Sequence, residues 1–350
     1  MTTAAYRQLI AATPRDRLDL FLMTANRLGT PVSNVEKDFW VCWTLHALYC
    51  ERPAGGPRLL FKGGTSLSKA YGLIERFSED IDITVFRDDL DEPVSVEELE
   101  SLSRKKRQAR LDAIRDACRA YITGPLREFL DVQIADATGG AGRIELDDAD
   151  PDGQTLLVWY PEVEPRDGTY VQPAVRIEAG AKSALDPHRP VMIEPYIAED
   201  AAGLDLKTDE VTTIDAARTF WDKVVIAHGL RRWHERRNVL RHEGQRVSRH
   251  YYDLHCLLRS NAGEAALADW NLGADCVHHA QMFFDRPDYD LASAAPGTFA
   301  ITPTAAMVGA LDNDYANTTA MVFGAAPTFE EILASIDEIE RVVNSLDSQR

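Results

Sequence analysis

The sequence predicts an α+β fold over roughly its first 210 residues and an all-helical region after them. Two observations support this prediction. Short apolar or alternating segments, which are typical of strands, occur only between residues 58 and 197. From Asp215 onward, apolar residues recur at helical spacing instead. We therefore expect two domains, residues 1–210 and residues 211–350, which agrees with a length of 350 residues.

Helices are predicted where apolar residues recur every three or four positions, because that spacing lines one face of a helix. The first predicted helix has Leu9, Phe21 and Leu28 near this spacing. The third follows a Gly-Gly turn, and Thr65 or Ser66 is a suitable N-cap for it. In chain order, the predicted helices span residues 4–29, 35–51, 65–76, 104–121, 215–230, 247–259, 262–283, 303–317 and 328–346.

Strands are predicted from short apolar runs and from alternation of polar and apolar residues. The segment Ile81–Phe86 (IDITVF) alternates in this way, as a half-buried strand does. Two segments without either pattern, residues 87–100 and 285–300, are predicted loops. In chain order, the predicted strands span residues 58–62, 81–86, 156–160, 170–178 and 190–197.

Charge and cysteine content limit the class of protein. The chain has 38 Lys and Arg against 56 Asp and Glu, a net charge of −18, which argues against a protein that simply coats nucleic acid. Its five cysteines have no metal-ligand spacing, which argues against a disulfide framework or a zinc site. The sequence shows neither a secretory signal nor an apolar run of about 18 residues. We therefore expect a cytoplasmic protein without membrane contact.

One stretch combines several features of a catalytic site: Phe61–Val85, FKGGTSLSKAYGLIERFSEDIDITV. Asp80 and Asp82 are alternate residues of a predicted strand, so both carboxylates point to the same face. Adjacent carboxylates repel each other unless a cation lies between them, and such oxygen ligands suit Mg²⁺. Glu178, on another predicted strand, is the expected third ligand of a site for one or two Mg²⁺ ions. The alternative is that these acidic residues are solvated strand positions.

The Gly-Gly turn is a candidate phosphate site. Gly63 and Gly64 have no side chains, so a phosphate can approach the backbone. The amides and hydroxyls of Thr65 and Ser66 would face that phosphate at a helix N-terminus. The stretch is not a Walker A loop, because Lys62 precedes the glycines and G-x-x-x-x-G-K-[ST] is absent. The predicted nucleotide-binding residues are Lys62, Gly63, Gly64, Thr65, Ser66 and Lys69.

These residues resemble a known family. Gly63–Ser66 with Asp80-x-Asp82 is similar to the opening signature of polymerase-β-like nucleotidyltransferases, and the whole stretch resembles the AbiEii/AbiGii toxin nucleotidyltransferases. The resemblance covers nearly the whole chain in matching order. Its further segments are Glu36–Trp40, Val175–Gly180, Arg218–Lys223, Arg249–Leu254, Asp314–Tyr315 and Phe329–Leu333.

The resemblance implies a bilobed toxin: a polymerase-β-like nucleotidyltransferase lobe, with a mixed sheet and flanking helices, followed by a helical lobe. Some members transfer nucleotides from an NTP to the 3′ end of tRNA, which blocks aminoacylation, and others are known mainly as nucleotide binders. Members act as toxins in toxin–antitoxin or phage-defence pairs, so a cognate antitoxin is expected. Two departures leave the target open: the long spacing from Lys223 to Asp253, and His250 where many members have an acid.

Two residues of the helical region are expected at the site. Lys223 lies in FWDKVVIAH beside an apolar face, and its amine would act as a point charge on the triphosphate. The alternative is a surface lysine paired with Asp222. Asp253 would orient Lys223 or contact RNA, or else form a structural ion pair. The predicted catalytic residues are Asp80, Asp82, Lys223 and Asp253.

Two basic segments bear on RNA binding. Residues 101–119 have seven Lys and Arg against two Asp, and residues 229–250 have seven Arg against two Glu, with Trp233 among them. Arginine suits phosphate, and a single-stranded 3′ end stacks on aromatic side chains. We therefore expect these segments to contact tRNA. The alternatives are two solvated helix faces, or the docking of an acidic antitoxin.

The expected function is Mg²⁺-dependent transfer of a nucleotide from an NTP to the 3′ end of tRNA by a monomeric toxin, which would block translation and growth. Transfer to a protein or to a small molecule is one alternative. A non-catalytic NTP-binding toxin is the other.

Overall fold

The computed structural model describes residues 2–163, 172–241, 246–319 and 321–346. The chain forms two compact units. Unit 1 consists of residues 1–70, 77–94 and 103–214, and unit 2 consists of residues 71–76, 95–102 and 215–350. The sequence prediction placed one boundary after residue 210, whereas the main change of unit follows residue 214 because a strand ends there. It did not foresee the two short segments that belong to unit 2.

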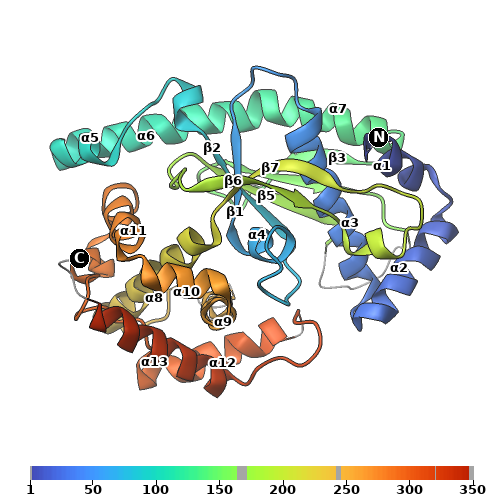
Figure 1. The fold of residues 1–350 in the computed structure, drawn as a ribbon. Coiled ribbons are helices and arrows are strands. Elements are labelled where there is room, and N and C mark those ends of the chain that lie inside the picture. The colour runs from blue at the N-terminus through green and yellow to red at the C-terminus, as the bar shows by residue number, and fades with distance from the viewer. Residues whose placement is uncertain (1, 164–171, 242–245, 320, 347–350) are drawn as a thin grey trace. The chain divides into compact units, whose positions relative to one another are not determined.

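Unit 1 is built on a seven-stranded mixed sheet (Figure 1). Its strands are β1 (Leu59–Lys62), β2 (Asp80–Val85), β3 (Arg143–Leu146), β4 (Thr155–Trp159), β5 (Ala174–Gly180), β6 (His188–Ile193) and β7 (Thr208–Ile214). Their order across the sheet is β3-β4-β5-β2-β1-β7-β6. Strand β2 runs antiparallel to β1 and parallel to β5, so it lies at the centre of the sheet.

The core of unit 1 explains why β2 presents carboxylates on one face. Ile81 and Ile83 are fully buried, and they alternate with the half-buried Asp80 and Asp82. Burial of each isoleucine contributes about 1.5–3 kcal/mol, so a slip of register by one residue would be costly. Helix α3 (Val32–His46) packs against β2, β5 and β7. The apolar residues therefore fix the direction in which both aspartates point.

The other helices of unit 1 flank this sheet. In Figure 1, α6 and α7 follow one another along one side of it. The helix predicted over 4–29 is two helices, because Thr13 accepts a hydrogen bond from the Asp16 N–H and Pro14 occupies the first helical position. The elements are α1 (Thr2–Ala11), α2 (Pro14–Leu28), η1 (Ala47–Glu51), α4 (Gly63–Lys69), η2 (Arg87–Leu90), α6 (Arg104–Tyr121), η3 (Ile122–Leu126), α7 (Arg127–Thr138) and η4 (Tyr196–Glu199).

Unit 2 is helical. Helix α8 packs against α10 and α11, and α9 packs against α12 and α13. Phe220 and Trp221 of α8 are fully buried, and the Trp221 indole donates to the Ala266 carbonyl. No helix within the described residues is both long and apolar enough to cross a membrane. The elements are α5 (Val96–Ser101), α8 (Ala216–Arg237), α9 (Ser248–Leu258), α10 (Asn261–Ala268), α11 (Trp270–Phe283), η5 (Pro287–Tyr289), η6 (Leu291–Ser293), α12 (Ala305–Thr319) and α13 (Phe329–Ser345).

Several predicted elements differ from the structure. The helix predicted over 65–76 begins at Gly63 and ends at Lys69, and the chain then turns at Gly72, whose φ is 61°. The helix predicted over 262–283 is two helices, because Asp269 caps a new one. The predicted strand 170–178 begins at residues outside the described ones, and β5 starts at Ala174. The sequence prediction missed α5, α7, β3 and β7.

Candidate active site

Strands β2 and β5 bring the three predicted acidic residues to one part of the sheet. In their parallel pairing, Asp80 lies opposite Arg176 and Asp82 lies opposite Glu178. Neighbouring strands are about 4.8 Å apart, so Glu178 is a close neighbour of Asp82. The sheet therefore has the arrangement that the alternation of residues predicted, and the role of these carboxylates as metal ligands stays a prediction.

Glu178 shares its face of β5 with Arg176. Arg176 Nε lies 3.0 Å from Glu178 Oε1, and Arg176 Nη2 lies 3.0 Å from Asp147 Oδ2. The guanidinium therefore supplies positive charge beside the carboxylates. Within the part of the chain that the structure describes, no group of three or more His, Cys, Asp and Glu is arranged to hold a metal ion. The oxygen donors on β2 and β5 are nevertheless the ligand type that Mg²⁺ prefers.

The Gly-Gly turn lies against the second aspartate of the pair. Gly63 has a φ of 78°, and a Cβ at this position would lie only 2.0 Å from Asp82 Oδ2. Lys62 pairs with Asp82 across β1 and β2, and its Nζ lies 3.8 Å from Asp82 Oδ1. Only glycine fits here, because both the backbone conformation and the space exclude a side chain.

The hydroxyls of Thr65 and Ser66 are engaged within the protein. Thr65 Oγ1 donates to the Asp80 carbonyl and lies 2.8 Å from Ser78 Oγ. Ser66 Oγ donates to the Gly63 carbonyl at 2.8 Å. Both side chains are buried, and their contacts with phosphate stay a prediction. The N-cap of α4 is Lys62, which corrects the prediction that Thr65 or Ser66 begins this helix.

Lys69, another of the predicted nucleotide-binding residues, is engaged within unit 1. Its amine is buried, pairs with Asp38, and lies 3.3 Å from the centroid of the Tyr196 ring. Burial alone would lower the pKa of Lys69, but the Asp38 carboxylate raises it, so the amine stays protonated. Lys69 therefore fastens α4 to α3, and its contact with a nucleotide stays a prediction.

The charged segment Glu36–Asp38 of α3 is a structural feature whose role the sequence did not reveal. Lys37 Nζ lies 2.6 Å from Oε2 of Glu79, which is the residue just before Asp80. The side chains of Glu36, Lys37 and Asp38 are all buried. Charged residues are seldom buried unless paired, so three together inside an apolar helix were the available sequence signal. The flanking acids accept backbone N–H groups, Glu36 from Val163 and Asp38 from Tyr196.

In unit 2, Lys223 and Asp253 lie together with Arg76. Lys223 Nζ is 2.8 Å from Asp253 Oδ2, and Arg76 Nε is 2.8 Å from Asp253 Oδ1. Arg76 Nη2 also donates to Asp253 Oδ2 at 3.0 Å. All three side chains are buried, with Asp253 at 0% exposure. Burial alone would raise the pKa of Asp253, but the two cations hold it well below its usual range.

This buried cluster has one positive charge in excess. Sequence analysis missed Arg76, although it lies within the stretch that carries the family resemblance. His250 lies three residues before Asp253 on α9, and its Nδ1 is buried with no hydrogen-bond partner among the described residues. Burial, with Lys223 and Arg249 nearby, lowers the pKa of His250 well below its usual value. His250 is therefore neutral at pH 7 and adds no further charge.

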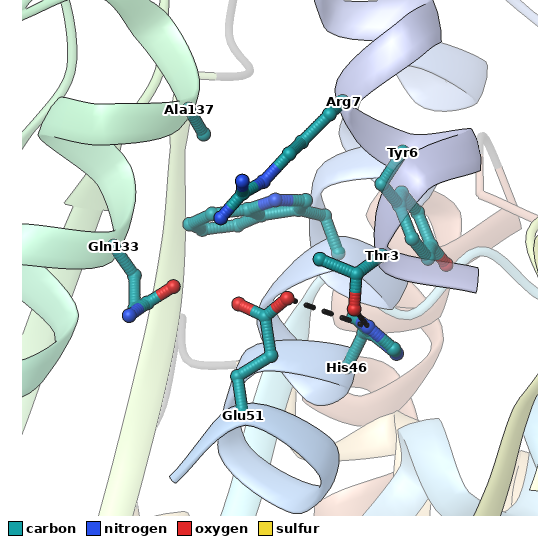
Figure 2. Close-up of a pocket in the computed structure, with 8 residues that line it drawn as sticks. Thr3, Tyr6, Arg7, His46, Glu51, Gln133 and Ala137 are labelled. Atoms are coloured by element: carbon teal, nitrogen blue, oxygen red, sulfur yellow. Dashed lines mark hydrogen bonds and ion pairs between the residues drawn. The ribbon is translucent and has the colours of Figure 1, made fainter. Parts of the chain in front are cut away.

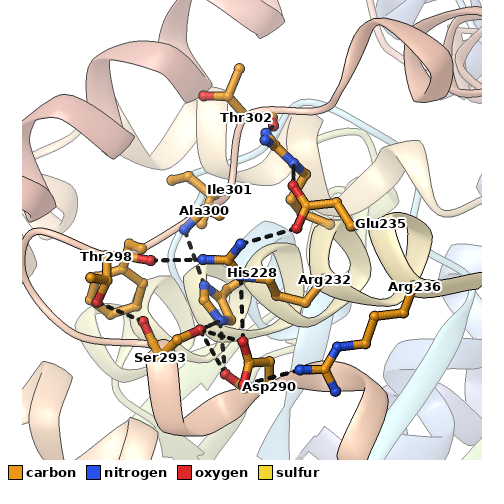
Figure 3. Close-up of polar contacts among 12 residues, drawn as sticks. His228, Arg232, Glu235, Arg236, Asp290, Ser293, Thr298, Ala300, Ile301 and Thr302 are labelled. Carbon is orange, nitrogen blue, oxygen red and sulfur yellow. Dashed lines mark hydrogen bonds and ion pairs between the residues drawn. The ribbon is translucent and has the colours of Figure 1, made fainter.

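The arginines of the second basic segment hold unit 2 together. Figure 3 shows Arg232 and Arg236 directed at Asp290, with Arg236 Nη2 3.3 Å from Asp290 Oδ1. Arg232 Nη2 also donates to the Thr298 carbonyl at 3.2 Å. Arg237 Nη2 lies 2.6 Å from a carboxylate oxygen of the neighbouring Asp288. These side chains fasten α8 to the connection after α11. Residues 242–245 of this segment lie outside the described residues.

Trp233 is half-buried and has an arginine and an aromatic neighbour within unit 2. The Arg241 guanidinium lies 4.9 Å from the centroid of its ring, and the Tyr289 ring lies 6.1 Å away. The Trp233 indole N–H is buried as well. The stacking of a 3′ end on this side chain stays a prediction.

A separate small pocket lies in unit 1 (Figure 2). In it, His46 Nε2 lies 3.0 Å from Thr3 Oγ1 and 3.7 Å from Glu51 Oε1. Burial lowers the pKa of His46. None of the predicted site residues lines this pocket, so it is distinct from the candidate active site. The lining residues are Thr3, Tyr6, Arg7, Trp43, His46, Glu51, Gln133 and Ala137.

The structure has a mixed sheet flanked by helices, which confirms the predicted α+β class, and a D-x-D strand lies beside the Gly-Gly segment. Residues 46–335 match the family described as "Nucleotidyl transferase AbiEii toxin, Type IV TA system". The chain belongs to this family, which confirms the resemblance inferred from its motifs. It is a toxin nucleotidyltransferase of a type IV toxin–antitoxin system.

Among solved structures, the chain is similar to MenT4, a nucleotidyltransferase toxin from Mycobacterium tuberculosis H37Rv. The two are 17% identical with a TM-score of 0.49, and the similarity covers 94% of this chain and 90% of that one. A comparison with curated protein sequences finds no match.

Proposed function

We propose that this toxin transfers a nucleotide from an NTP to the 3′ end of tRNA, with Mg²⁺, and thereby blocks aminoacylation, translation and growth. The observation that supports this best is the register of β2 and β5, which aligns Asp82 with Glu178. Asp80 lies on the same face of β2 as Asp82, and the Asp82 carboxylate lies against Gly63, where a Cβ would clash with it. Carboxylates on rigid strands next to accessible backbone suit phosphoryl-group chemistry, which depends mainly on positioning and charge.

In the proposed reaction, the 3′-hydroxyl oxygen of the acceptor bonds to the α-phosphorus, and the bond from that phosphorus to the pyrophosphate oxygen breaks. Asp80 and Asp82 would hold one or two Mg²⁺ ions, with Glu178 as third ligand. The metal, when bound, supplies positive charge to the triphosphate and the attacking oxygen. One of the two aspartates accepts the proton of the hydroxyl.

Positive groups of the chain would complete the charge balance. Lys62 and the backbone of Gly63 and Gly64 are proposed to contact the β- and γ-phosphates. Lys223 is proposed to neutralise charge as pyrophosphate leaves, which is an electrostatic contribution to catalysis. Asp253 holds the Lys223 amine in one position, and the positive charge in excess in that cluster supports this role.

The proposal also names an acceptor, tRNA, and a partner protein, a cognate antitoxin. An acidic chain needs a local positive surface to bind RNA, and α6 provides exposed cations. The toxin–antitoxin family supports a cognate antitoxin as the partner. We further propose that the toxin acts in the cytoplasm, as a monomer, in growth control or phage defence.

An acceptor screen tests the proposal. The protein would be incubated with Mg²⁺, each α-³²P-labelled NTP in turn, and total tRNA, with matched reactions that contain bulk protein or small-molecule hydroxyl compounds instead. Parallel reactions would use γ-³²P-labelled NTP. The expected result is label on tRNA from one α-labelled NTP and none from the γ-labelled form, because pyrophosphate leaves.

The other outcomes separate the alternatives. Label on protein or on a small molecule, without label on tRNA, would replace the acceptor but keep the reaction. Label from the γ position would indicate a phosphotransferase. Saturable NTP binding with no label on any acceptor would favour a non-catalytic NTP-binding toxin.

A further inference from the structure

The start of α6 bears a cationic patch that consists of Arg104, Lys105 and Lys106. All three side chains are exposed. Across the described ranges, none of the three takes part in a side-chain hydrogen bond or an ion pair. Carboxylates outnumber cations in this chain, which has a net charge of −18. A shortage of acidic partners therefore does not explain the patch.

Other basic residues differ from this patch because they form ion pairs within the protein. These residues lie later in α6 and on α8. Arg110 pairs with Glu92, and Arg119 Nη2 lies 3.1 Å from Asp116 Oδ1. On α8, Arg231 Nε lies 2.6 Å from a carboxylate oxygen of Glu235. Several of the cations that the sequence offered to RNA are thus paired with carboxylates, whereas those of the cationic patch stay available.

The fold gains no stability from the patch. Cations in the first turn of a helix oppose the positive end of the helix dipole, at a cost of about 0.3–1 kcal/mol each. Three consecutive like charges also repel one another. The Ser103 hydroxyl caps this turn by accepting from the Lys106 N–H at 3.5 Å, which offsets only part of the cost. A surface that costs stability is better explained by a ligand than by the fold.

We propose that the cationic patch binds the sugar–phosphate backbone of the acceptor RNA, several nucleotides away from its reacting end. This inference rests on the proposed function. Asp80 is the first of six residues of β2, and the strand leads toward η2, which packs against α6; the five residues after Asp80 span about 17 Å. An NTP at Asp80 does not extend that far, whereas a tRNA acceptor arm does.

The geometry favours RNA over a protein partner. Successive helical residues point about 100° apart, so the three side chains spread over a wide arc instead of forming one flat face. Lysine is depleted at the cores of protein–protein interfaces. Phosphate contacts, in contrast, tolerate varied side-chain geometry and depend mainly on the number of charges neutralised.

The test compares two triple variants with equal charge. One is Arg104→Gln with Lys105→Gln and Lys106→Gln. The matched control replaces three other cations of unit 1 that are exposed and unpaired within the described residues, namely Arg7→Gln, Arg15→Gln and Lys207→Gln. Steady-state transfer would be measured against tRNA and against NTP at several salt concentrations, with direct tRNA binding measured by fluorescence anisotropy.

The patch variant should raise the KM for tRNA about tenfold or more at 0.15 M salt, with a shallower salt dependence, because up to three phosphate contacts are lost. Its kcat and its KM for NTP should stay unchanged, since the interaction is equal in ground and transition states. The control variant should stay within about twofold of the unmodified protein, because it keeps the contacts that set RNA affinity.

Two results would overturn the inference. Equal KM and equal binding for tRNA in both variants, with transfer intact, would remove the patch from RNA recognition while the proposed function stands. Normal tRNA binding with lost binding of a co-expressed antitoxin would assign the patch to a protein. If the unmodified protein labels no RNA, the proposed function fails, and the anisotropy measurement alone then decides whether the patch binds tRNA.

Discussion

Gly63 is a single residue with little tolerance for change. Its backbone lies in the left-handed region, and the Asp82 carboxylate occupies the space of a side chain. Any added carbon must therefore displace a proposed metal ligand. This contact also shows that the two motifs, which are 19 residues apart in the sequence, lie together in the structure.

We expect Gly63→Ala to abolish transfer and to lower the free energy of unfolding by about 1–2 kcal/mol through backbone strain. Gly72→Ala is the matched control, because its φ of 61° is similar but no atom lies within 4 Å of the added Cβ. It should show the strain and keep the activity. Chemical denaturation measures the loss of stability, and the transfer assay measures the activity. Equal transfer by the two variants would show that the Asp82 contact does not matter.

Asp253 is the second residue with a sharp expectation. We expect Asp253→Asn to lower the free energy of unfolding at pH 7 by about 3–5 kcal/mol, because Arg76 and Lys223 are then left as unbalanced buried cations. Asp222→Asn is the control, since its half-exposed side chain lies 3.7 Å from Arg218 and its loss should cost under about 1 kcal/mol. Similar losses in the two variants would contradict the buried cluster.

The pH dependence of the same variant gives an independent test. The folded protein lowers the pKa of Asp253, so its contribution to stability is present above the unfolded pKa of about 4 and is lost as pH falls through the folded pKa. The stability difference between the unmodified protein and Asp253→Asn should therefore shrink below about pH 4. A difference that stays constant from pH 7 to pH 3 would argue against an ionised Asp253.

At the element scale, α8 holds the connection between α11 and α12 through His228 as well as through its arginines (Figure 3). His228 Nδ1 accepts from the Ala300 N–H at 3.1 Å, and its Nε2 lies 3.3 Å from the Asp290 carbonyl. This arrangement requires the neutral ring, because a protonated Nδ1 cannot accept. Burial, with Arg232 adding to it, lowers the pKa of His228 to about 4, although Asp290 opposes the shift.

Stability should therefore fall as pH drops from about 6.5, where the unfolded histidine gains a proton, toward about 4, where the folded one does. The loss should be a few kcal/mol, about 1.4 for each pH unit. His228→Asn keeps an acceptor near Ala300 and should remove this slope. Urea denaturation between pH 7 and pH 4.5 measures it. An unchanged slope in the variant would assign the pH dependence to other groups.

The sequence predicted the elements that depend on a local pattern of charged and apolar residues. Helix α6 begins and ends where charge and apolar spacing placed it, and β2 was recognised by alternation that burial reproduces. Strand β7 (TDEVTTI) was missed because its sequence is largely polar and its strand character depends on pairing with β1 and β6. For the site, alternation predicted that Glu178 faces the same way as Asp82, but the partners Arg76 and Glu79 depend on contacts between distant segments.

At the scale of the whole molecule, the chain changes unit several times before residue 215. The segment 71–76 precedes β2 in sequence but belongs to unit 2, where Arg76 pairs with Asp253 and the Glu75 carbonyl accepts from the Phe323 N–H. A single cut in the sequence cannot represent such an arrangement. Composition and periodicity are read along the sequence, so they suggested a simple division into two lobes and did not reveal the two short segments that belong to unit 2.

We expect a fragment of residues 1–214 not to fold stably on its own, because segments 71–76 and 95–102 lose the unit that they belong to and Arg76 loses its partner. Circular dichroism and amide exchange on the purified fragment measure this. The intact chain is the control. A monomeric fragment with cooperative unfolding would show that unit 1 is independent.

We propose that Asp80-x-Asp82 on β2 is the centre of nucleotidyl transfer. The most direct measurement is α-³²P transfer to the acceptor by Asp80→Asn, next to the unmodified protein and to Asp88→Asn, an exposed aspartate on η2. We predict that Asp80→Asn loses transfer by about 10²–10³-fold or more while it unfolds at nearly the same temperature, and that Asp88→Asn is unaffected. Transfer by a folded Asp80→Asn protein within about tenfold of the unmodified rate would contradict the account.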